Sequence, residues 1–114
     1  MSKEDGKIDW SDKGEKVYNL IRGTIPFPGA FTYYKGRKLK ITRARFLDDY
    51  QGEADTGFPK PGRVVKIEKD AILISTGDKG IIKILRLIPA SSKELTAEQF
   101  VNGYKIKAGD VVGE

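Results

Sequence analysis

The sequence contains no cysteine and no histidine, and these two absences remove most of the common catalytic and metal-binding chemistries. Without cysteine there are no disulfides and no thiol nucleophiles. Without histidine there is no Ser-His-Asp triad and no imidazole proton transfer. A metal site would need oxygen ligands alone, and no stretch has the spacing of an EF-hand loop. We therefore expect no catalytic centre, no metal and no cofactor in this chain.

Long apolar runs are also absent, because the longest extends over only a few residues. A membrane-spanning helix needs about 20 apolar residues, and the polar N-terminus lacks the apolar stretch of a signal peptide. The 114 residues fit one domain, and we expect a cytoplasmic protein without a membrane partner. Residues 1–9 are mostly polar and predict a mobile linker tail rather than a folded element, so residues 10–114 are the predicted domain.

A helix is predicted after Trp10, because its first turn has the chemistry of a helix N-terminus. Ser11 or Asp12 suits the N-cap position, and Asp12 with Glu15 has the spacing of a capping box. An apolar face at helical spacing consists of Val17, Leu20 and Ile21. Gly23 predicts the end of the helix. Trp10 is expected to pack in the core or against the helix, and stacking on a ligand is its less favoured role.

The segment from Ile21 to Phe31 is predicted to be a stiff connector from this helix to a sheet. Pro26 and Pro28 hold the residues before them out of the helical region of backbone space. The apolar side chains that would pin the helix to the sheet are Ile25, Phe27 and Phe31.

From Phe31 onwards the apolar residues recur with the spacing of strands. A hairpin is predicted from 31–34 and 37–47 around a tight turn at Lys35-Gly36. The alternation changes phase near Thr42-Arg43, which predicts a β-bulge there. Further strands are predicted at 62–67, 71–76, 81–87 and 104–107.

A second, short helix is predicted from a capping box formed by Thr96 and Gln99, and Gly103 is its predicted end. The sum of these elements is a mainly β fold. We expect a small OB-like β-barrel with an N-terminal helix and a short C-terminal helix, because closing such a sheet removes its exposed edges.

Positive charge exceeds negative charge, with a net charge of +5 and an isoelectric point near 9.4. Six basic residues with no acidic residue among them follow Tyr33 and Tyr34, and they are Lys35, Arg37, Lys38, Lys40, Arg43 and Arg45. A basic hairpin beside aromatic residues is typical of contact with a phosphate backbone. A solvated strand face, whose charge discourages edge pairing, explains the pattern equally well. Lys105 and Lys107 extend the basic surface if the C-terminus packs alongside.

Several segments together resemble the C-terminal domain of methionyl-tRNA formyltransferases. The segments are residues 2–11 with Ile8-Asp9-Trp10-Ser11, residues 19–23, residues 26–32 with Pro26-Phe27-Pro28-Gly29-Ala30, residues 39–41, residues 61–64, residues 75–80 and residues 95–103. They occur in the family's order and span essentially the whole chain. Amino-sugar formyltransferases and formyltetrahydrofolate dehydrogenase carry related domains.

The resemblance implies an OB-like barrel and an accessory role. The full enzymes transfer a formyl group from 10-formyltetrahydrofolate, and their catalytic residues and cofactor site lie in an N-terminal domain that this chain lacks. Residues 1–9 then correspond to the interdomain linker. The implied partners are initiator Met-tRNA, held through non-specific positive charge, and the N-terminal catalytic domain. Lys3 in the linker and Lys105 join the hairpin as candidate contacts.

Two alternatives remain open. Ile88, Ser91 and Ser92 depart from the pattern of the tRNA enzymes, which favours a packing domain of an amino-sugar N-formyltransferase without nucleic-acid binding. The acidic residues between Asp48 and Pro61 read as a solvated loop. A metal site there, or a self-sufficient enzyme built on its carboxylates, is the least favoured interpretation.

Overall fold

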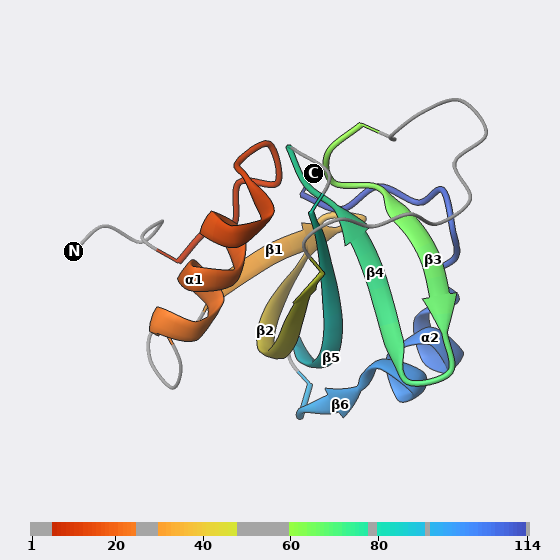
Figure 1. Ribbon diagram of the computed structural model, residues 1–114. Coiled ribbons are helices and arrows are strands. Elements are labelled where there is room, and N and C mark those ends of the chain that lie inside the picture. The colour runs from red at the N-terminus through yellow and green to blue at the C-terminus, as the bar shows by residue number, and fades with distance from the viewer. Residues whose placement is uncertain (1–5, 25–29, 48–59, 78–79, 91, 114) are drawn as a thin grey trace.

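The computed structural model describes residues 6–24, 30–47, 60–77, 80–90 and 92–113. Within them the elements are α1 (Gly14–Thr24), β1 (Ala30–Tyr34), β2 (Arg37–Leu47), β3 (Val64–Glu68), β4 (Ala71–Ser75), β5 (Ile81–Pro89), β6 (Leu95–Thr96) and α2 (Ala97–Tyr104). Figure 1 shows the two helices well apart from each other, with α1 beside β1 and β2 and α2 near β6. No helix in the described ranges is long and apolar enough to span a membrane.

The strands form one antiparallel sheet in the order β1-β2-β5-β4-β3, and β6 pairs with β5 (Figure 1). The predicted mainly β class with two helices is confirmed. The sheet is open, however, because the named strands at its two ends, β1 and β3, do not pair with each other. The expected barrel is therefore not closed by strand pairing.

The C-terminal segment 109–113 lies between these two end strands instead. On one side the Val64 N–H donates to Asp110 O at 2.9 Å, and the Val112 N–H donates to Gly62 O at 2.8 Å. On the other side the Gly113 N–H donates to Tyr33 O at 2.6 Å. Backbone groups of both sheet edges are thus satisfied by one segment. The strand predicted at 104–107 is wrong, since the C-terminal pairing occurs further along the chain.

The N-terminal segment 6–10 packs on the free edge of β1. The Ile8 N–H donates to Phe31 O and the Phe31 N–H donates to Gly6 O, both at 2.8 Å. Ile8 and Trp10 are 3% and 5% exposed. The described part of the predicted linker tail is therefore ordered against the sheet, contrary to expectation, and the predicted core position of Trp10 is confirmed.

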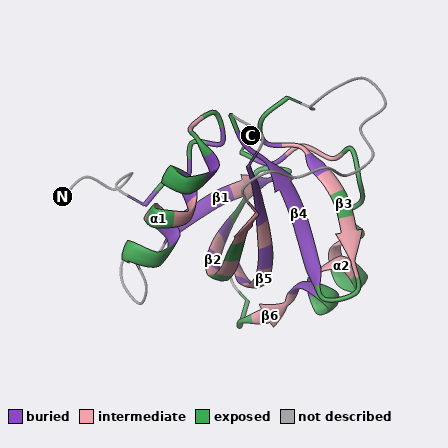
Figure 2. Ribbon diagram, in the orientation of Figure 1, coloured by how far each residue is buried: buried purple, intermediate pink, exposed green. Residues whose placement is uncertain are grey.

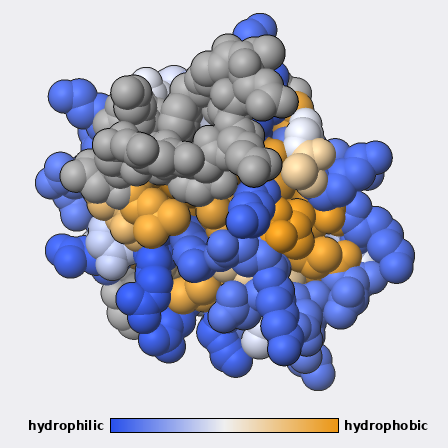
Figure 3. Space-filling model, turned by 45° about the vertical axis from the view of Figure 1, so that its right-hand side comes forward, coloured by the Kyte–Doolittle hydropathy of each residue, from blue (hydrophilic) through white to orange (hydrophobic). Residues whose placement is uncertain are grey.

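The main core lies on one face of the sheet, between the strands and both helices. Val17 and Ile21 of α1 and Phe100 of α2 are almost completely buried there. A smaller apolar cluster of Ala71, Leu73 and Ile81 lies on the other face, so β4 is buried throughout its length (Figure 2). Hydrophilic side chains surround small apolar areas on the face drawn in Figure 3.

Helix α1 begins one residue later than a cap at Asp12 predicts and two residues later than a cap at Ser11 predicts. It starts at Gly14 and ends at Thr24, one residue beyond the predicted stop at Gly23. Asp12 forms an i,i+4 ion pair with Lys16 at 3.7 Å. Gly14 is closely packed at this helix start, because a Cβ there would lie 2.5 Å from Phe46 Cε1.

Helix α2 has the predicted capping box. The Gln99 N–H donates to Thr96 Oγ1 at 3.2 Å, and the Thr96 N–H donates to Gln99 Oε1 at 3.0 Å. The predicted stop at Gly103 is wrong, since the helix continues to Tyr104. Lys105 closes it in the left-handed conformation, with φ of 60°.

Some predictions fall outside the described residues. They concern the tail with Lys3, the connector residues Ile25, Pro26, Phe27 and Pro28, and the acidic positions Asp48, Asp49 and Glu53.

Candidate nucleic-acid interface

The hairpin β1-β2 is built as its sequence predicts. Lys35 and Gly36 both have positive φ, 51° and 80°, which is the conformation of the two-residue turns that match strand twist. The turn sets the register of the strands, and Tyr33 pairs with Lys38 while Phe31 pairs with Lys40. Because cross-strand partners share a face, these four side chains lie on one surface of the hairpin. We call it the outer hairpin face.

An irregular register in β2 keeps the basic residues together. Leu39 and Ile41 face the core, and strict alternation would bring Arg43 and Arg45 to the core as well. The pairing with β5 is irregular on both sides of Arg43, and the core-facing position is then Ala44. Arg43 and Arg45 are consequently exposed. The predicted phase change is confirmed, and it places four cations of β2 on the outer hairpin face: Lys38, Lys40, Arg43 and Arg45.

Ion pairing distinguishes these cations from their neighbours. On β5, Lys83 pairs with Glu68 at 2.9 Å and Arg86 with Glu94 at 3.6 Å. Arg45 is the cross-strand partner of Lys83, and Arg43 that of Arg86. Within the described residues no cation of β2 is in an ion pair. No carboxylate of the described residues therefore neutralises the charge of the outer hairpin face.

Two aromatic rings lie among these charges. Phe31 and Tyr33 meet edge to face, with ring centroids 5.8 Å apart. The Lys38 ammonium lies 4.3 Å from the Phe31 centroid, and the Lys7 ammonium lies 6.0 Å from that of Tyr33. Cations over ring faces are attracted by the ring quadrupole, which favours this alternation of charge and ring. Phe31 is covered, whereas Tyr33 is half-buried.

The remaining candidate residues lie at the turn end of the hairpin. Arg37 lies over Tyr104 of α2, with 5.9 Å between its guanidinium and the ring centroid. Lys35 lies over Tyr34 at 5.3 Å, and Lys105 directly follows Tyr104 at the end of α2. Lys35, Arg37 and Lys105 are exposed. They form a second basic group, separate from the cations of the outer hairpin face.

A hydrogen bond joins this end of the hairpin to the C-terminal segment. The Tyr34 hydroxyl donates to Asp110 Oδ2 at 2.7 Å, and the Lys107 N–H donates to the same oxygen at 3.1 Å. Burial, followed by the hydrogen bond to Asp110, raises the pKa of Tyr34 to about 12. Burial would raise the pKa of Asp110, but these hydrogen bonds and the cations Lys107 and Lys35 outweigh it and lower that pKa.

Lys7 is the residue of this surface that the sequence did not single out. A parallel bridge between Lys7 and Phe31 brings it beside Tyr33. The available signal was the alternation of Lys7, Ile8, Asp9 and Trp10, in which every second residue is apolar. Among the described residues there is no group of three or more acidic side chains that could hold a metal ion.

The family model described as "Formyl transferase, C-terminal domain" matches residues 1–105. The chain belongs to this family. The chain is 37% identical to the methionyl-tRNA formyltransferase of Bacillus subtilis over 113 residues. The match covers 99% of this chain and 34% of that protein. With the methionyl-tRNA formyltransferase of Halothermothrix orenii it shares 38% identity over 99% of the chain. The chain thus spans about a third of the length of these relatives.

Solved structures agree with the fold of this formyl transferase C-terminal domain. HypX from Aquifex aeolicus in complex with tetrahydrofolic acid superposes with a TM-score of 0.71 at 21% identity, over 91% of this chain and 18% of HypX. A HypX variant gives a TM-score of 0.72 over 96% of this chain and 19% of HypX. At this identity the likeness concerns the fold. The family membership predicted from the sequence is confirmed by the sequence comparisons.

Proposed function

We propose that this chain is the tRNA-binding C-terminal domain of a methionyl-tRNA formyltransferase. In the full protein, an N-terminal domain would bind 10-formyltetrahydrofolate and transfer the formyl group to initiator Met-tRNA. The chain itself would hold the tRNA backbone. The observation that carries this proposal is the row of four cations on the outer hairpin face, none of them in an ion pair with a described residue.

The expected binding is electrostatic and independent of base sequence. Each phosphate neutralised by a lysine or arginine releases condensed counterions, so affinity falls steeply with salt. Exposed side chains on a strand contact phosphates without reading base edges. We expect micromolar or weaker affinity for the domain alone. Linked to a catalytic domain, it would raise the effective concentration of the tRNA acceptor end there.

The test compares two variants with the same loss of charge. In the first, Lys38, Lys40, Arg43 and Arg45 are changed to Gln. In the matched control, the exposed residues Lys13, Arg22, Lys69 and Lys93 are changed to Gln. Fluorescence anisotropy measures binding of labelled tRNA at about 50 and 200 mM salt.

The outer-face variant should lose most of its affinity, and its dependence of log K on log salt should become shallower by about 3. The control variant should retain most of the tRNA affinity and most of its salt dependence. Equal losses in the two variants would show that only net charge matters and would overturn the assignment to the hairpin. An unmodified chain that binds no tRNA at 50 mM salt would overturn the proposed function and favour a packing domain of an amino-sugar formyltransferase.

A further inference from the structure

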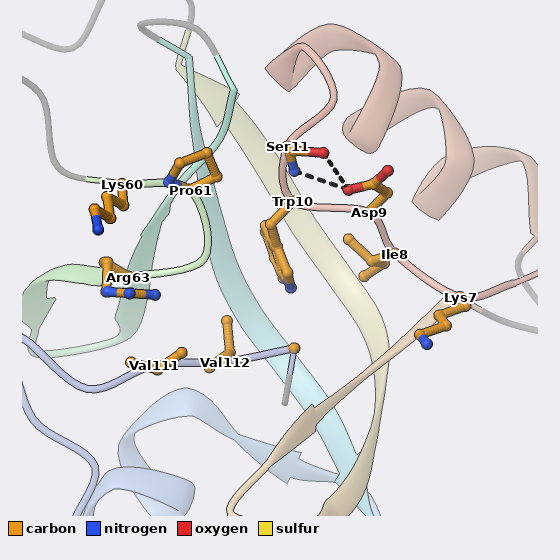
Figure 4. A pocket seen from close by; sticks show the side chains of 11 residues that line it. Lys7, Ile8, Asp9, Trp10, Ser11, Lys60, Pro61, Arg63, Val111 and Val112 are labelled. Atoms are coloured by element: carbon orange, nitrogen blue, oxygen red, sulfur yellow. Dashed lines mark hydrogen bonds between the residues drawn. The ribbon is translucent and has the colours of Figure 1, made fainter.

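Figure 4 shows an open groove, of about 770 Å³, that meets the outer hairpin face at Lys7, whose ammonium lies over the Tyr33 ring. Three segments that are distant in the sequence line it: residues 7–11, residues 60–63 and residues 111–113. The neighbourhood is held by backbone pairing, because Arg63 and Val111 form an antiparallel bridge. The groove therefore belongs to the architecture of the domain.

Its floor is apolar and closely packed around one indole ring. Trp10 contributes that ring, and its Nε1–H donates to Thr32 Oγ1 at 2.8 Å. Backbone approaches the ring at two glycines with positive φ, Gly62 and Gly113. A Cβ at Gly113 would lie 3.0 Å from Trp10 Cδ1, and one at Gly62 would lie 2.9 Å from Val112 O. Any residue larger than glycine at position 62 or 113 would push away Val112 O or the Trp10 ring, respectively. The floor of the groove is therefore tightly packed.

The walls carry more positive than negative charge. Lys7 lies on one side, and Lys60 and Arg63 lie on the other (Figure 4). None of the three is in an ion pair with a described residue. The one carboxylate, Asp9, is occupied by hydrogen bonds from Ser11, whose N–H donates at 3.0 Å and whose hydroxyl donates at 2.5 Å. An anion entering the groove would meet three cations, none of them ion-paired with a described carboxylate.

An anionic group joined to a flat, largely apolar body fits this combination of walls and floor. A nucleotide has that chemistry, since its phosphate suits the cations and the flat faces of its base and ribose suit an apolar floor. Lys7 also connects the groove to the outer hairpin face, because its ammonium lies over Tyr33. A strand of RNA on the hairpin would therefore reach the groove past Lys7 without leaving positively charged surface.

We infer that the groove binds a single-stranded nucleotide of an RNA whose neighbouring phosphates lie on the outer hairpin face. The phosphate of this nucleotide lies between Arg63, Lys60 and Lys7, and its base or ribose lies on the apolar floor beneath which the Trp10 ring is packed, with 5% of Trp10 exposed. This inference rests on the proposed function and extends its RNA contacts to a second site. It identifies the bound part of the RNA as unpaired, because a duplex leaves no separate base to enter.

Trp10 allows the groove to be observed directly, because it is the only tryptophan in the chain. The probe is a single-stranded RNA of about five nucleotides, a length typical of small single-strand sites. Its titration should change the Trp10 emission and end-labelled anisotropy over the same concentration range. Changing Lys60 and Arg63 to Gln should weaken binding about tenfold at 100 mM salt and remove the emission change.

The matched control changes two exposed lysines far from the groove, Lys69 and Lys93, to Gln, and it should keep the emission change and most of the affinity. Thermal unfolding followed by circular dichroism shows that both variants are folded. Saturating anisotropy without any Trp10 response, together with unchanged affinity in the groove variant, would overturn the groove inference and leave the proposed function intact. A chain that binds tRNA but not this single-stranded RNA would likewise overturn the groove inference alone, whereas a chain that binds neither would overturn the proposed function itself.

Discussion

The hydroxyl of Tyr34 lies 2.7 Å from Oδ2 of Asp110, 76 residues later in the chain, and donates a hydrogen bond to it. Tyr34 ends the first strand of the hairpin, and Asp110 lies in the segment that connects β1 to the residues around β3. The contact therefore joins the candidate RNA-binding hairpin to the part of the chain that completes the sheet.

Changing Tyr34 to Phe should destabilise the domain by about 1 kcal/mol, as expected for loss of one hydrogen bond to a partly exposed carboxylate. The ring would keep its edge-to-face contact with Phe100, whose centroid is 6.1 Å away. Urea unfolding measures the difference. Changing Tyr33 to Phe is the control, because its hydroxyl has no hydrogen-bond partner among the described residues, and it should leave stability almost unchanged. Similar losses in both variants would contradict this account.

The same contact predicts a stability that falls at both ends of the pH scale. The pKa of Tyr34 is raised from 10.0 to about 12. Between those values the residue ionises in the unfolded chain and stays protonated in the folded one, so its contribution is lost as pH rises from 10 to 12. The pKa of Asp110 is lowered from 3.8, so its contribution is present above that value and is lost as pH falls through the folded pKa.

The measurement is the difference in unfolding free energy between the unmodified chain and the Tyr34→Phe variant across this pH range. Ionisations common to both proteins cancel in the difference. We expect it to be largest and constant near neutral pH and to shrink below pH 3.8 and above pH 10. A difference that does not vary with pH would show that Tyr34 and Asp110 are not coupled.

Two glycines of α1 should respond in opposite directions to the same substitution. A Cβ at Gly14 would lie 2.5 Å from Phe46 Cε1 and 3.1 Å from Gly80 Cα, so Gly14→Ala should cost about 1–3 kcal/mol through overpacking. Gly23 has no such neighbour within 4 Å, and Gly23→Ala should stabilise the domain by up to about 1 kcal/mol. Thermal unfolding of the two variants checks both signs, and a stabilising Gly14→Ala would contradict the packing at Phe46.

The features that sequence predicted well depend on residues close together in the chain. The hairpin turn requires only that Lys35 and Gly36 accept positive φ, and the capping box requires only Thr96 and Gln99. The basic row was likewise visible as a run of residues. Its common face depends on the register change near Arg43, which the shift in apolar alternation also revealed.

The features that sequence missed depend on distant partners. In the sequence, Gly14 indicates only a weak helix position. The structure shows that Phe46 and Gly80 pack against it, which leaves no room for a side chain. In the sequence, Ile8 is a single apolar residue in a polar tail. In the structure its backbone N–H donates to Phe31 O of β1. The groove around Trp10 needs three separate segments, and no local pattern in any of them indicates the other two. Local chemistry therefore predicted the hairpin surface but not the second site beside it.

The pairing of segment 109–113 with both ends of the sheet has a consequence for synthesis of the protein. Every strand leaves the ribosome before the residues that satisfy Tyr33 O on one edge and Gly62 O on the other. A nascent chain that stops short of residue 109 carries two incomplete strand edges, which are templates for pairing with other chains. Truncation within segment 109–113 should therefore reduce the yield of soluble protein by more than the loss of its few buried apolar side chains would explain.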